Sequence, residues 1–375
     1  MNRDPALAPE TALLLRCARG APDVTAISEL AGQKIDWSTF LQLAETHGLS
    51  SLCCRRLEQA DSVPVDARER LRGSLRIDAE RNLFLTGELF RVLDQFRERG
   101  VDALTFKGPV LGWWLYGHPG LRRCSDVDVL VDAGAVDRAI GALTEIGYTA
   151  EMCRQGKPKI VPSTGQISLF RNAPPAEVDL HWDLAPRAMG LSLNARSLLP
   201  RSMAVIVGGR PVLTFGVEDQ FLLCAFHGGK HGWKSLGWLA DFAALIETRA
   251  PDWPRLLAEA RRKQLSRALF VGLHLAHDLL GTPLPAAIRN PMKRDSAAAS
   301  VAAETRAFLV RGTAPRALFP RELRYELGLT EGWGRKAAFC WRKITEPSPE
   351  DSEMSKSARP FRLMRKYAYR LAGLQ

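Results

Sequence analysis

Two aspartates separated by one residue are the most informative chemical feature of the sequence. Asp126 and Asp128 lie in the stretch SDVDVLV, whose pattern predicts a strand over Ser125–Val131. Because side chains alternate between the faces of a strand, both carboxylates point to one face, about 6 to 7 Å apart along it. The two carboxylates repel each other unless a hard divalent cation neutralises their charge. The spacing favours a shared metal site, while solvated carboxylates at a turn stay open as the alternative for this pair alone.

Groups suited to phosphate lie close to this pair in the sequence. A predicted strand, Val101–Phe106, ends in Lys107 and Gly108, and a short helix follows. A loop rich in glycine and arginine then leads through Arg122 to Ser125. Helix N-termini, lysines and arginines all attract anionic oxygens. We therefore expect these four residues to bind the phosphates of a substrate next to the metal.

A second acidic stretch, Glu177–Asp183, reads EVDLHWD and also has a period of two. Its three acidic residues and His181 share one strand face. Asp179 is the best candidate for a third carboxylate, which would complete the metal site or take the proton from an attacking hydroxyl. His181 would contact the substrate from the same face. A solvated strand face explains this spacing equally well.

The stretch HGGKHGW places His227 and His231 four residues apart, on one face of a predicted helix. A zinc protease motif needs a glutamate directly after the first histidine, and none is present. We expect Lys230, with one or both histidines, to contact phosphate or substrate; packing at a helix end is the alternative interpretation. The sequence also contains no P-loop, dinucleotide-binding or serine-hydrolase motif.

Strands that alternate with helices in the middle of the chain predict an α+β fold, with a small mixed sheet between helical segments. Before this region, apolar residues at three-to-four spacing predict one long helix over 65–99, stopped by Gly100. After it, two short apolar runs joined by Gly208 and Gly209 predict a hairpin, and further helices follow. The expected parts are an N-terminal helical segment (1–100), the sheet core (101–215), a C-terminal helical domain (216–345), and a polar linker with a basic tail helix (346–375).

The composition is that of a globular protein: the 375 residues carry 52 Lys and Arg against 41 Asp and Glu, a net charge of +11. No apolar run approaches the roughly 18 residues of a membrane-spanning helix, and the first apolar cluster is too short for a secretory signal, so we expect a cytoplasmic protein. The seven cysteines are odd in number and contain no Cys-x-x-Cys pair, which predicts reduced thiols.

The C-terminal tail is strongly basic, because every charged residue after Glu353 is a lysine or an arginine. Such a tail attracts anionic partners, although its apolar residues favour a helix docked onto the body.

The order of strand, glycine turn, helix, SDVD strand and later carboxylate strand resembles the polymerase-beta-like nucleotidyltransferase superfamily. Five motifs are similar, more closely, to the uncharacterised bacterial nucleotidyltransferase family. They are LTFKG (104–108), YGHPGLR (116–122), SDVD (125–128), VDLHW (178–182) and HGGKH (227–231). The resemblance covers most of the chain. It implies transfer of a nucleoside monophosphate from a nucleoside triphosphate to an acceptor hydroxyl, in the biosynthesis of peptide natural products or polysaccharides.

The resemblance also implies how the metal is bound. Asp126 and Asp128 would be shared ligands of two Mg²⁺ (or Mn²⁺) ions, and Asp179 would be the third ligand. The superfamily usually has Gly-Ser or Gly-Gly at the turn after the first strand, whereas this chain has Gly108 and Pro109. Because proline has no amide hydrogen, binding of the triphosphate would depend more on Lys107, Arg122 and Ser125.

Two alternatives to this enzyme stay open. A non-catalytic nucleotide- or peptide-binding module of the same fold would bind its ligand without releasing pyrophosphate. An RNA-modifying nucleotidyltransferase would use the basic tail, and its RNA binding would depend steeply on salt. We favour nucleic acid less, because a docked tail helix accounts for the same residues. A small molecule, a sugar and a peptide all fit the role of acceptor.

Overall fold

The computed structural model describes residues 7–150, 165–184, 193–311, 325, 327–332, 334 and 336–339. The predicted linker and basic tail helix lie outside the described residues, as do Cys153 and Cys340. The five cysteines that lie within the described residues are free thiols. No helix in this part of the chain is long and apolar enough to cross a membrane.

The middle of the chain forms a mixed seven-stranded sheet in the order β3-β4-β5-β2-β1-β7-β6. The strands are β1 (Ala103–Phe106), β2 (Val127–Val131), β3 (Thr149–Ala150), β4 (Gln166–Asn172), β5 (Pro175–His181), β6 (Met203–Val207) and β7 (Arg210–Thr214). β1 pairs antiparallel with β2 and parallel with β7, while β2 and β5 run parallel. Gly208 and Gly209 join β6 to β7 at positive φ. The predicted α+β fold with a mixed sheet is confirmed.

Two strands next to the predicted site, β1 and β2, begin later in the chain than the sequence predicted. β1 begins at Ala103 and not at Val101, and β2 begins at Val127 and not at Ser125. The ladder between β2 and β5 also begins at Val127, which pairs with Val178. Since the buried apolar run starts at this residue, the strand starts there too, and the polar residues before it stay in the loop.

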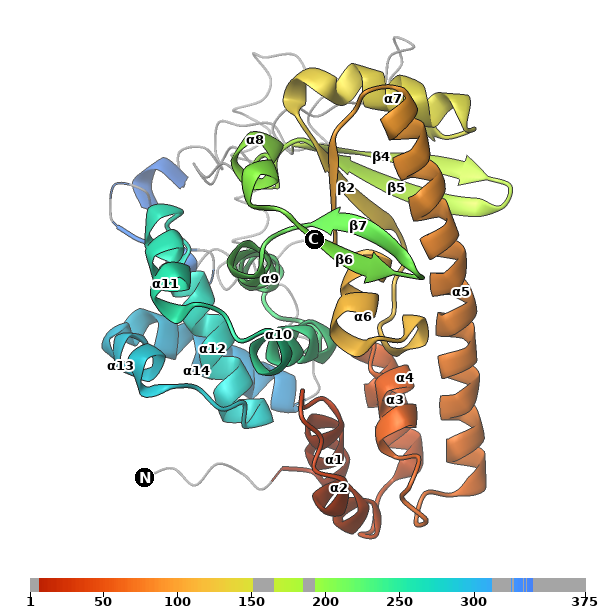
Figure 1. Ribbon diagram of the computed structural model, residues 1–375. Coiled ribbons are helices and arrows are strands. Elements are labelled where there is room, and N and C mark those ends of the chain that lie inside the picture. Colours follow the sequence, from red (N-terminus) through yellow and green to blue (C-terminus); the bar gives the residue numbers. More distant parts are fainter. Residues whose placement is uncertain are drawn as a thin grey trace, which may run out of the picture.

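Among the described residues, five helices precede the sheet: α1 (Pro9–Cys17), α2 (Val24–Ala31), α3 (Trp37–Thr46), α4 (Ser50–Arg56) and α5 (Val65–Glu98). α5 is the predicted long helix, and its buried residues include Leu85, Leu89, Val92 and Phe96 on one face. It runs along one side of the molecule beside the sheet, and the four shorter helices gather near its N-terminal end (Figure 1).

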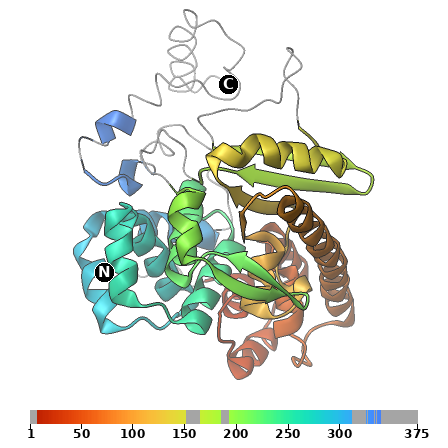
Figure 2. The same cartoon turned by 45° about the horizontal axis from the view of Figure 1, so that its top comes forward.

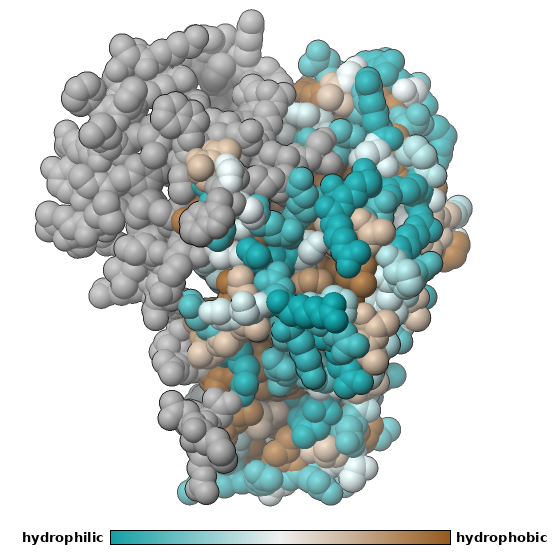
Figure 3. Space-filling view, turned by 90° about the vertical axis from the view of Figure 1, so that its left-hand side faces the viewer, coloured by the Kyte–Doolittle hydropathy of each residue, from teal (hydrophilic) through white to brown (hydrophobic). Residues whose placement is uncertain are grey.

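The other helices follow individual strands or form a C-terminal group. They are α6 (Gly108–Tyr116) after β1, α7 (Val136–Glu145) after β2, α8 (Ala195–Leu198), α9 (Val217–Lys230), α10 (Leu236–Arg249), α11 (Trp253–Arg262), α12 (Ser266–Leu280), α13 (Ala286–Arg294) and α14 (Ser296–Arg311). The group from α10 to α14 lies on the opposite side of the molecule from α5 in both ribbon views (Figures 1 and 2). Its outward face is mostly hydrophilic where the surface belongs to described residues, with smaller hydrophobic patches (Figure 3). One hydrophobic cluster runs from Leu13 in α1 through Val129 in β2 to Leu273 in α12, so these parts share a continuous core.

Candidate active site

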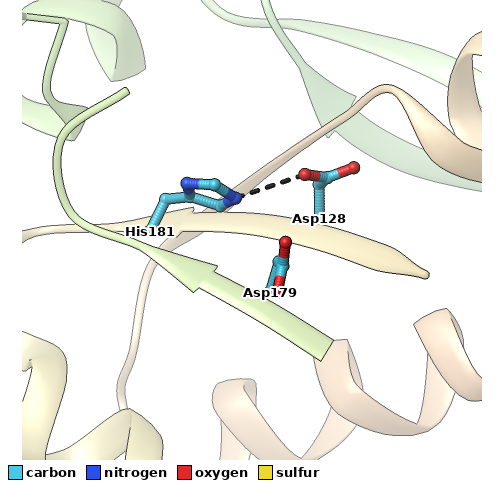
Figure 4. Close-up of side chains that lie close together, drawn as sticks. All are labelled: Asp128, Asp179 and His181. Atoms are coloured by element: carbon cyan, nitrogen blue, oxygen red, sulfur yellow. Dashed lines mark hydrogen bonds and ion pairs between the residues drawn. The ribbon is translucent and has the colours of Figure 1, made fainter. Parts of the chain in front are cut away.

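Asp128 and Asp179 meet in the middle of the sheet. β2 and β5 pair in parallel with Asp128 directly opposite Asp179. The ligand atoms of Asp128, Asp179 and His181 lie within 4.8 Å of one another, and no other group of this kind exists among the described residues. Figure 4 shows the imidazole of His181 directed at Asp128, with Asp179 beside them. The sheet thus joins two carboxylates and an imidazole from two segments that are remote in the chain.

Asp128 is an acidic residue inside an otherwise apolar strand. β2 reads VDVLV with all five residues buried, and Asp128 is 5% exposed. A carboxylate in such a place is costly unless it is paired and hydrogen-bonded. Two partners meet this need: Lys107 Nζ lies 3.6 Å and His181 Nε2 lies 3.2 Å from its Oδ1. The fold therefore retains a buried charge at this point by surrounding it with basic groups.

The two aspartates of the SDVD motif have pKa values shifted in opposite directions. Burial by itself would raise the pKa of Asp128, but the charge of Lys107 and the His181 hydrogen bond outweigh it, so the pKa lies below its usual value. The pKa of Asp126 is raised, first by burial and then by the charges of Asp128 and Asp179. The charges of Lys107 and Arg122 lower this pKa without cancelling the increase, and a bound cation would relieve the repulsion between the carboxylates.

Asp126 lies close to this group without being part of it. It precedes β2, is partly buried, and is not one of the three residues whose ligand atoms converge. The influence of Asp128 and Asp179 on its pKa places it in their neighbourhood. Because β2 begins only at Val127, strand alternation does not fix the position of Asp126. Its role as a metal ligand stays a prediction.

Asp179 is held by a serine of the neighbouring strand. Ser168 in β4 lies opposite Asp179 in the antiparallel pairing of β4 with β5, and its hydroxyl donates to Asp179 Oδ1. No hydrogen bond to Oδ2 is found within the described part of the chain, which leaves that oxygen for a cation or a proton. The sequence analysis missed Ser168, because only the strand register reveals which residue faces Asp179.

The turn from β1 into α6 has a backbone that aims Lys107 at the site. Lys107 has a φ of 50° and Gly108 a φ of 44°, values that L side chains rarely adopt. A Cβ atom on Gly108 would approach the carbonyl oxygen of Asp126 to 3.0 Å. Pro109 lies in the first turn of α6, where the missing amide hydrogen breaks no helical hydrogen bond. The turn requires glycine at 108, and it brings the ammonium of Lys107 to Asp128.

The two predicted phosphate ligands of the following loop lie in different environments. Arg122 Nε is 2.8 Å from Asp241 Oδ2 in α10, and its Nη1 donates to the carbonyl oxygen of Gly108 at 3.2 Å. These contacts tie the loop to α10 and to the β1–α6 turn. Ser125 has an exposed side chain, and its carbonyl oxygen accepts a hydrogen bond from Arg81. Phosphate binding by Arg122 and Ser125 stays a prediction, and the sequence analysis did not foresee the partnership with Asp241.

The C-terminal end of α9 lies beside the carboxylate site, close enough for Lys107 to affect both of its histidines. The rings of His227, His231 and Trp238 contact one another, with centroids 4.7 to 5.6 Å apart. Burial, followed by the charge of Lys107, lowers the pKa of His227 to about 2. Burial, followed by the charge of Lys230, lowers the pKa of His231 to about 4. Both imidazoles are therefore neutral at pH 7, while Lys230 is exposed at the helix end.

The sequence matches the model of a family described as uncharacterised nucleotidyltransferase over residues 33–281, a range that includes every residue of the predicted site. No curated protein matches the sequence.

Three solved structures are similar to parts of the chain. The solution structure of the antibiotic-resistance factor ANT(2'')-Ia is 13% identical, with a TM-score of 0.35 over 49% of this chain and 94% of that chain. The lincomycin-bound crystal structure of the lincosamide antibiotic adenylyltransferase LnuA is 22% identical, with a TM-score of 0.27 over 36% of this chain and 83% of that chain. An antigenic nucleotidyltransferase-like protein from Paracoccidioides brasiliensis is 14% identical, with a TM-score of 0.29 over 50% of this chain and 91% of that chain.

Proposed function

The chain belongs to the uncharacterised nucleotidyltransferase family, and we propose that it transfers a nucleoside monophosphate from a nucleoside triphosphate to a hydroxyl group of an acceptor. The observation that carries this proposal is the convergence of Asp128, Asp179 and His181 at one point of the sheet, beside Lys107. Carboxylates attract a divalent cation, and a lysine ammonium attracts phosphate oxygens. A metal-bound nucleoside triphosphate is a substrate that satisfies both.

The donor set fits a divalent cation. Asp128 has a lowered pKa and is ionised, and Asp179 keeps one oxygen free of hydrogen bonds to described residues. We propose that Asp128 and Asp179 bind Mg²⁺ or Mn²⁺, and that His181 is a further ligand. Asp126 would share a second ion with Asp128. When bound, the ions neutralise charge on the phosphates and lower the pKa of the acceptor hydroxyl.

The basic residues around the carboxylates would position the triphosphate. Lys107 reaches the site from the start of α6, so its ammonium can bind a phosphate oxygen next to Asp128. The neutral imidazoles of His227 and His231 can each donate one hydrogen bond to phosphate without adding charge. Arg122 donates a hydrogen bond to the carbonyl oxygen of Gly108 and thereby fixes the turn that carries Lys107.

The transfer itself exchanges one phosphorus–oxygen bond for another. The oxygen of the acceptor hydroxyl forms a bond to the α-phosphorus, and the bond from that phosphorus to the oxygen bridging to the β-phosphate breaks. Pyrophosphate leaves with the electrons of the broken bond. The hydroxyl proton leaves to solvent water, because the oxygen of Asp179 that Ser168 does not bind is assigned to the metal.

Pyrophosphate release from each of the four nucleoside triphosphates, with Mg²⁺ or Mn²⁺, tests this function. Asp128→Asn is compared with the wild type and with Asp137→Asn, a control at an exposed position of α7. We expect release with one nucleotide that Asp128→Asn lowers about 10³-fold or more and the control leaves unchanged. Near-normal transfer by Asp128→Asn would show that this carboxylate is not a metal ligand.

The same assay addresses the acceptor and the non-catalytic alternative. Precursors of peptide natural products and of polysaccharides are the first acceptors to add, with RNA as a comparison. If no combination of nucleotide, metal and acceptor releases pyrophosphate, but a nucleotide stabilises the protein against heat, the result would favour a binding module of the same fold.

A further inference from the structure

A polar cavity of about 320 Å³ lies next to the carboxylate site. The end of α3, the start of α4, the loop before β2 and the start of α10 line it. Two lining residues also border the site, because Ser125 precedes Asp126 and Trp238 contacts the ring of His227. Its volume is at the lower end of the range for sites that bind small molecules.

The lining combines the ring-bearing residues Trp238, Tyr116 and His47 with polar groups of both charges. Trp238 is partly buried, while Glu45 and Arg123 are exposed. The buried pair of Arg122 and Asp241 also lines the cavity, so the formal charges of these acids and arginines balance. A polyanion such as a triphosphate does not suit a balanced lining. A sugar ring does, since its faces carry apolar C–H groups that stack on an indole and its edges carry hydroxyls that both donate and accept.

One wall of the cavity is held in place by its own hydrogen bonds. The hydroxyl of Tyr116 donates to Asp241 Oδ1 at 2.9 Å, and Arg122 Nε donates to Asp241 Oδ2 at 2.8 Å. No partner of Arg122 Nη2 is found among the described residues, so this nitrogen remains a donor for a ligand. Polar groups fixed in this way lose little conformational freedom when a ligand binds.

We propose that this cavity binds the acceptor, and that the acceptor is a small polyhydroxylated ring compound, a monosaccharide unit, stacked on Trp238. The term acceptor rests on the proposed function, whereas the recognition of a sugar ring rests on the cavity alone. The peptide that joins Ser125 to Asp126 connects the cavity to the carboxylates. A bound ring therefore presents its hydroxyls at the border of the site where the transfer would take place.

Ligand-observed saturation-transfer NMR on the full chain, without nucleotide or metal, tests the proposal. The probes are glucose, glucosamine, N-acetylglucosamine and rhamnose, with adenosine as a comparison. We expect at least one sugar to bind, and Trp238→Ala to weaken that binding at least about tenfold. Trp253→Ala is the matched control, because Trp253 packs against Phe221 and does not line the cavity. Arg123→Ala removes an exposed cation of the lining and should weaken binding several-fold without affecting folding.

Two results would overturn the proposal: no binding by any sugar of the panel, or sugar binding that Trp238→Ala and Arg123→Ala leave unchanged. Binding of adenosine alone, lost in Trp238→Ala, would assign the cavity to the nucleoside of the substrate and would also overturn it. If Trp238→Ala does not fold, as judged by circular dichroism, Arg123→Ala decides. Since no nucleotide is present, failure of pyrophosphate release would contradict the proposed function and leave the sugar measurement intact.

Discussion

The Nζ atom of Lys107 lies 3.6 Å from Oδ1 of Asp128, so the ammonium reaches the buried carboxylate from the turn after the neighbouring strand. In the absence of substrate, this contact offsets much of the cost of burying Asp128. Lys107 can also bind a phosphate oxygen of a nucleotide beside that carboxylate. Under the proposed function, this residue has two roles, stabilising the site and recognising phosphate.

Replacing Lys107 by methionine should lower kcat/KM for the nucleotide by about 10²- to 10³-fold, because one positive charge at the phosphates is lost. Thermal unfolding should also shift to lower temperature, since Asp128 loses its charge partner. Steady-state pyrophosphate release and calorimetry measure the two effects. Lys234→Met, at an exposed position, is the control. Equal losses in both variants would show that Lys107 has no specific role.

Substituting Gly108 by alanine should destabilise the protein by about 1 to 3 kcal/mol and reduce transfer. The cause is a positive φ combined with a Cβ atom 3.0 Å from the carbonyl oxygen of Asp126. Gly141→Ala is the matched control, because this glycine lies inside α7 with open space around its Cβ position. The control should be neutral or more stable by up to about 1 kcal/mol. Urea unfolding of both variants gives the comparison, and a stable Gly108→Ala would mean that the turn relaxes.

His181 should govern the affinity of the site for a cation. Replacing it by alanine removes the Asp128 hydrogen bond and one candidate ligand, so Mn²⁺ should bind about 10- to 100-fold more weakly. His181→Gln keeps a polar group and should recover part of this affinity. Isothermal titration with Mn²⁺ measures both, and His118→Ala, at an exposed position of the loop before β2, is the control. Unchanged Mn²⁺ affinity in His181→Ala would remove His181 from the metal site.

The buried pair of Arg122 and Asp241 should behave as one unit in a double-mutant cycle. Arg122→Met and Asp241→Asn should each destabilise the fold by about 3 to 5 kcal/mol, because each leaves a buried charge without its partner. The double variant should lose less than the sum of the two losses. Chemical denaturation of the four proteins supplies the cycle. Strict additivity would mean that the 2.8 Å contact contributes no coupling energy.

Glu259 should make the stability of the C-terminal helices depend on acid pH. The hydrogen bond from Arg262, opposed by burial and aided by Arg201, lowers the pKa of Glu259 from 4.5 to about 2. A carboxylate with a lowered pKa stabilises the fold fully above its unfolded pKa, and this stability is lost as the pH falls toward the folded pKa. The stability difference between the wild type and Glu259→Gln should therefore be constant well above pH 4.5 and shrink as the pH falls from 4.5 to about 2.

Urea unfolding at a series of pH values measures this dependence. Glu29→Gln is the control, because Glu29 is exposed on α2. A difference between wild type and Glu259→Gln that grows as the pH falls would contradict the assignment of these ion pairs.

Patterns of three to seven residues were sufficient to predict the elements that carry the site. The period of α5 and the alternation in the two acidic stretches depend only on neighbouring residues, and the sequence alone therefore indicated the long helix, the mixed sheet and a shared face for Asp179 and His181. The family resemblance rested on the same short motifs, and the family match confirmed it.

The tertiary structure alone decided which strands and helices become neighbours, and therefore which side chains meet. Asp128 lies opposite Asp179 because β2 pairs with β5, and a strand's own residues do not specify which strand becomes its neighbour. The same holds for the contact of Arg122 with Asp241 and for the approach of His227 to Lys107, which depend on how α9 and α10 pack. Local periodicity sets the direction of a side chain, whereas long-range pairing and packing set its partners.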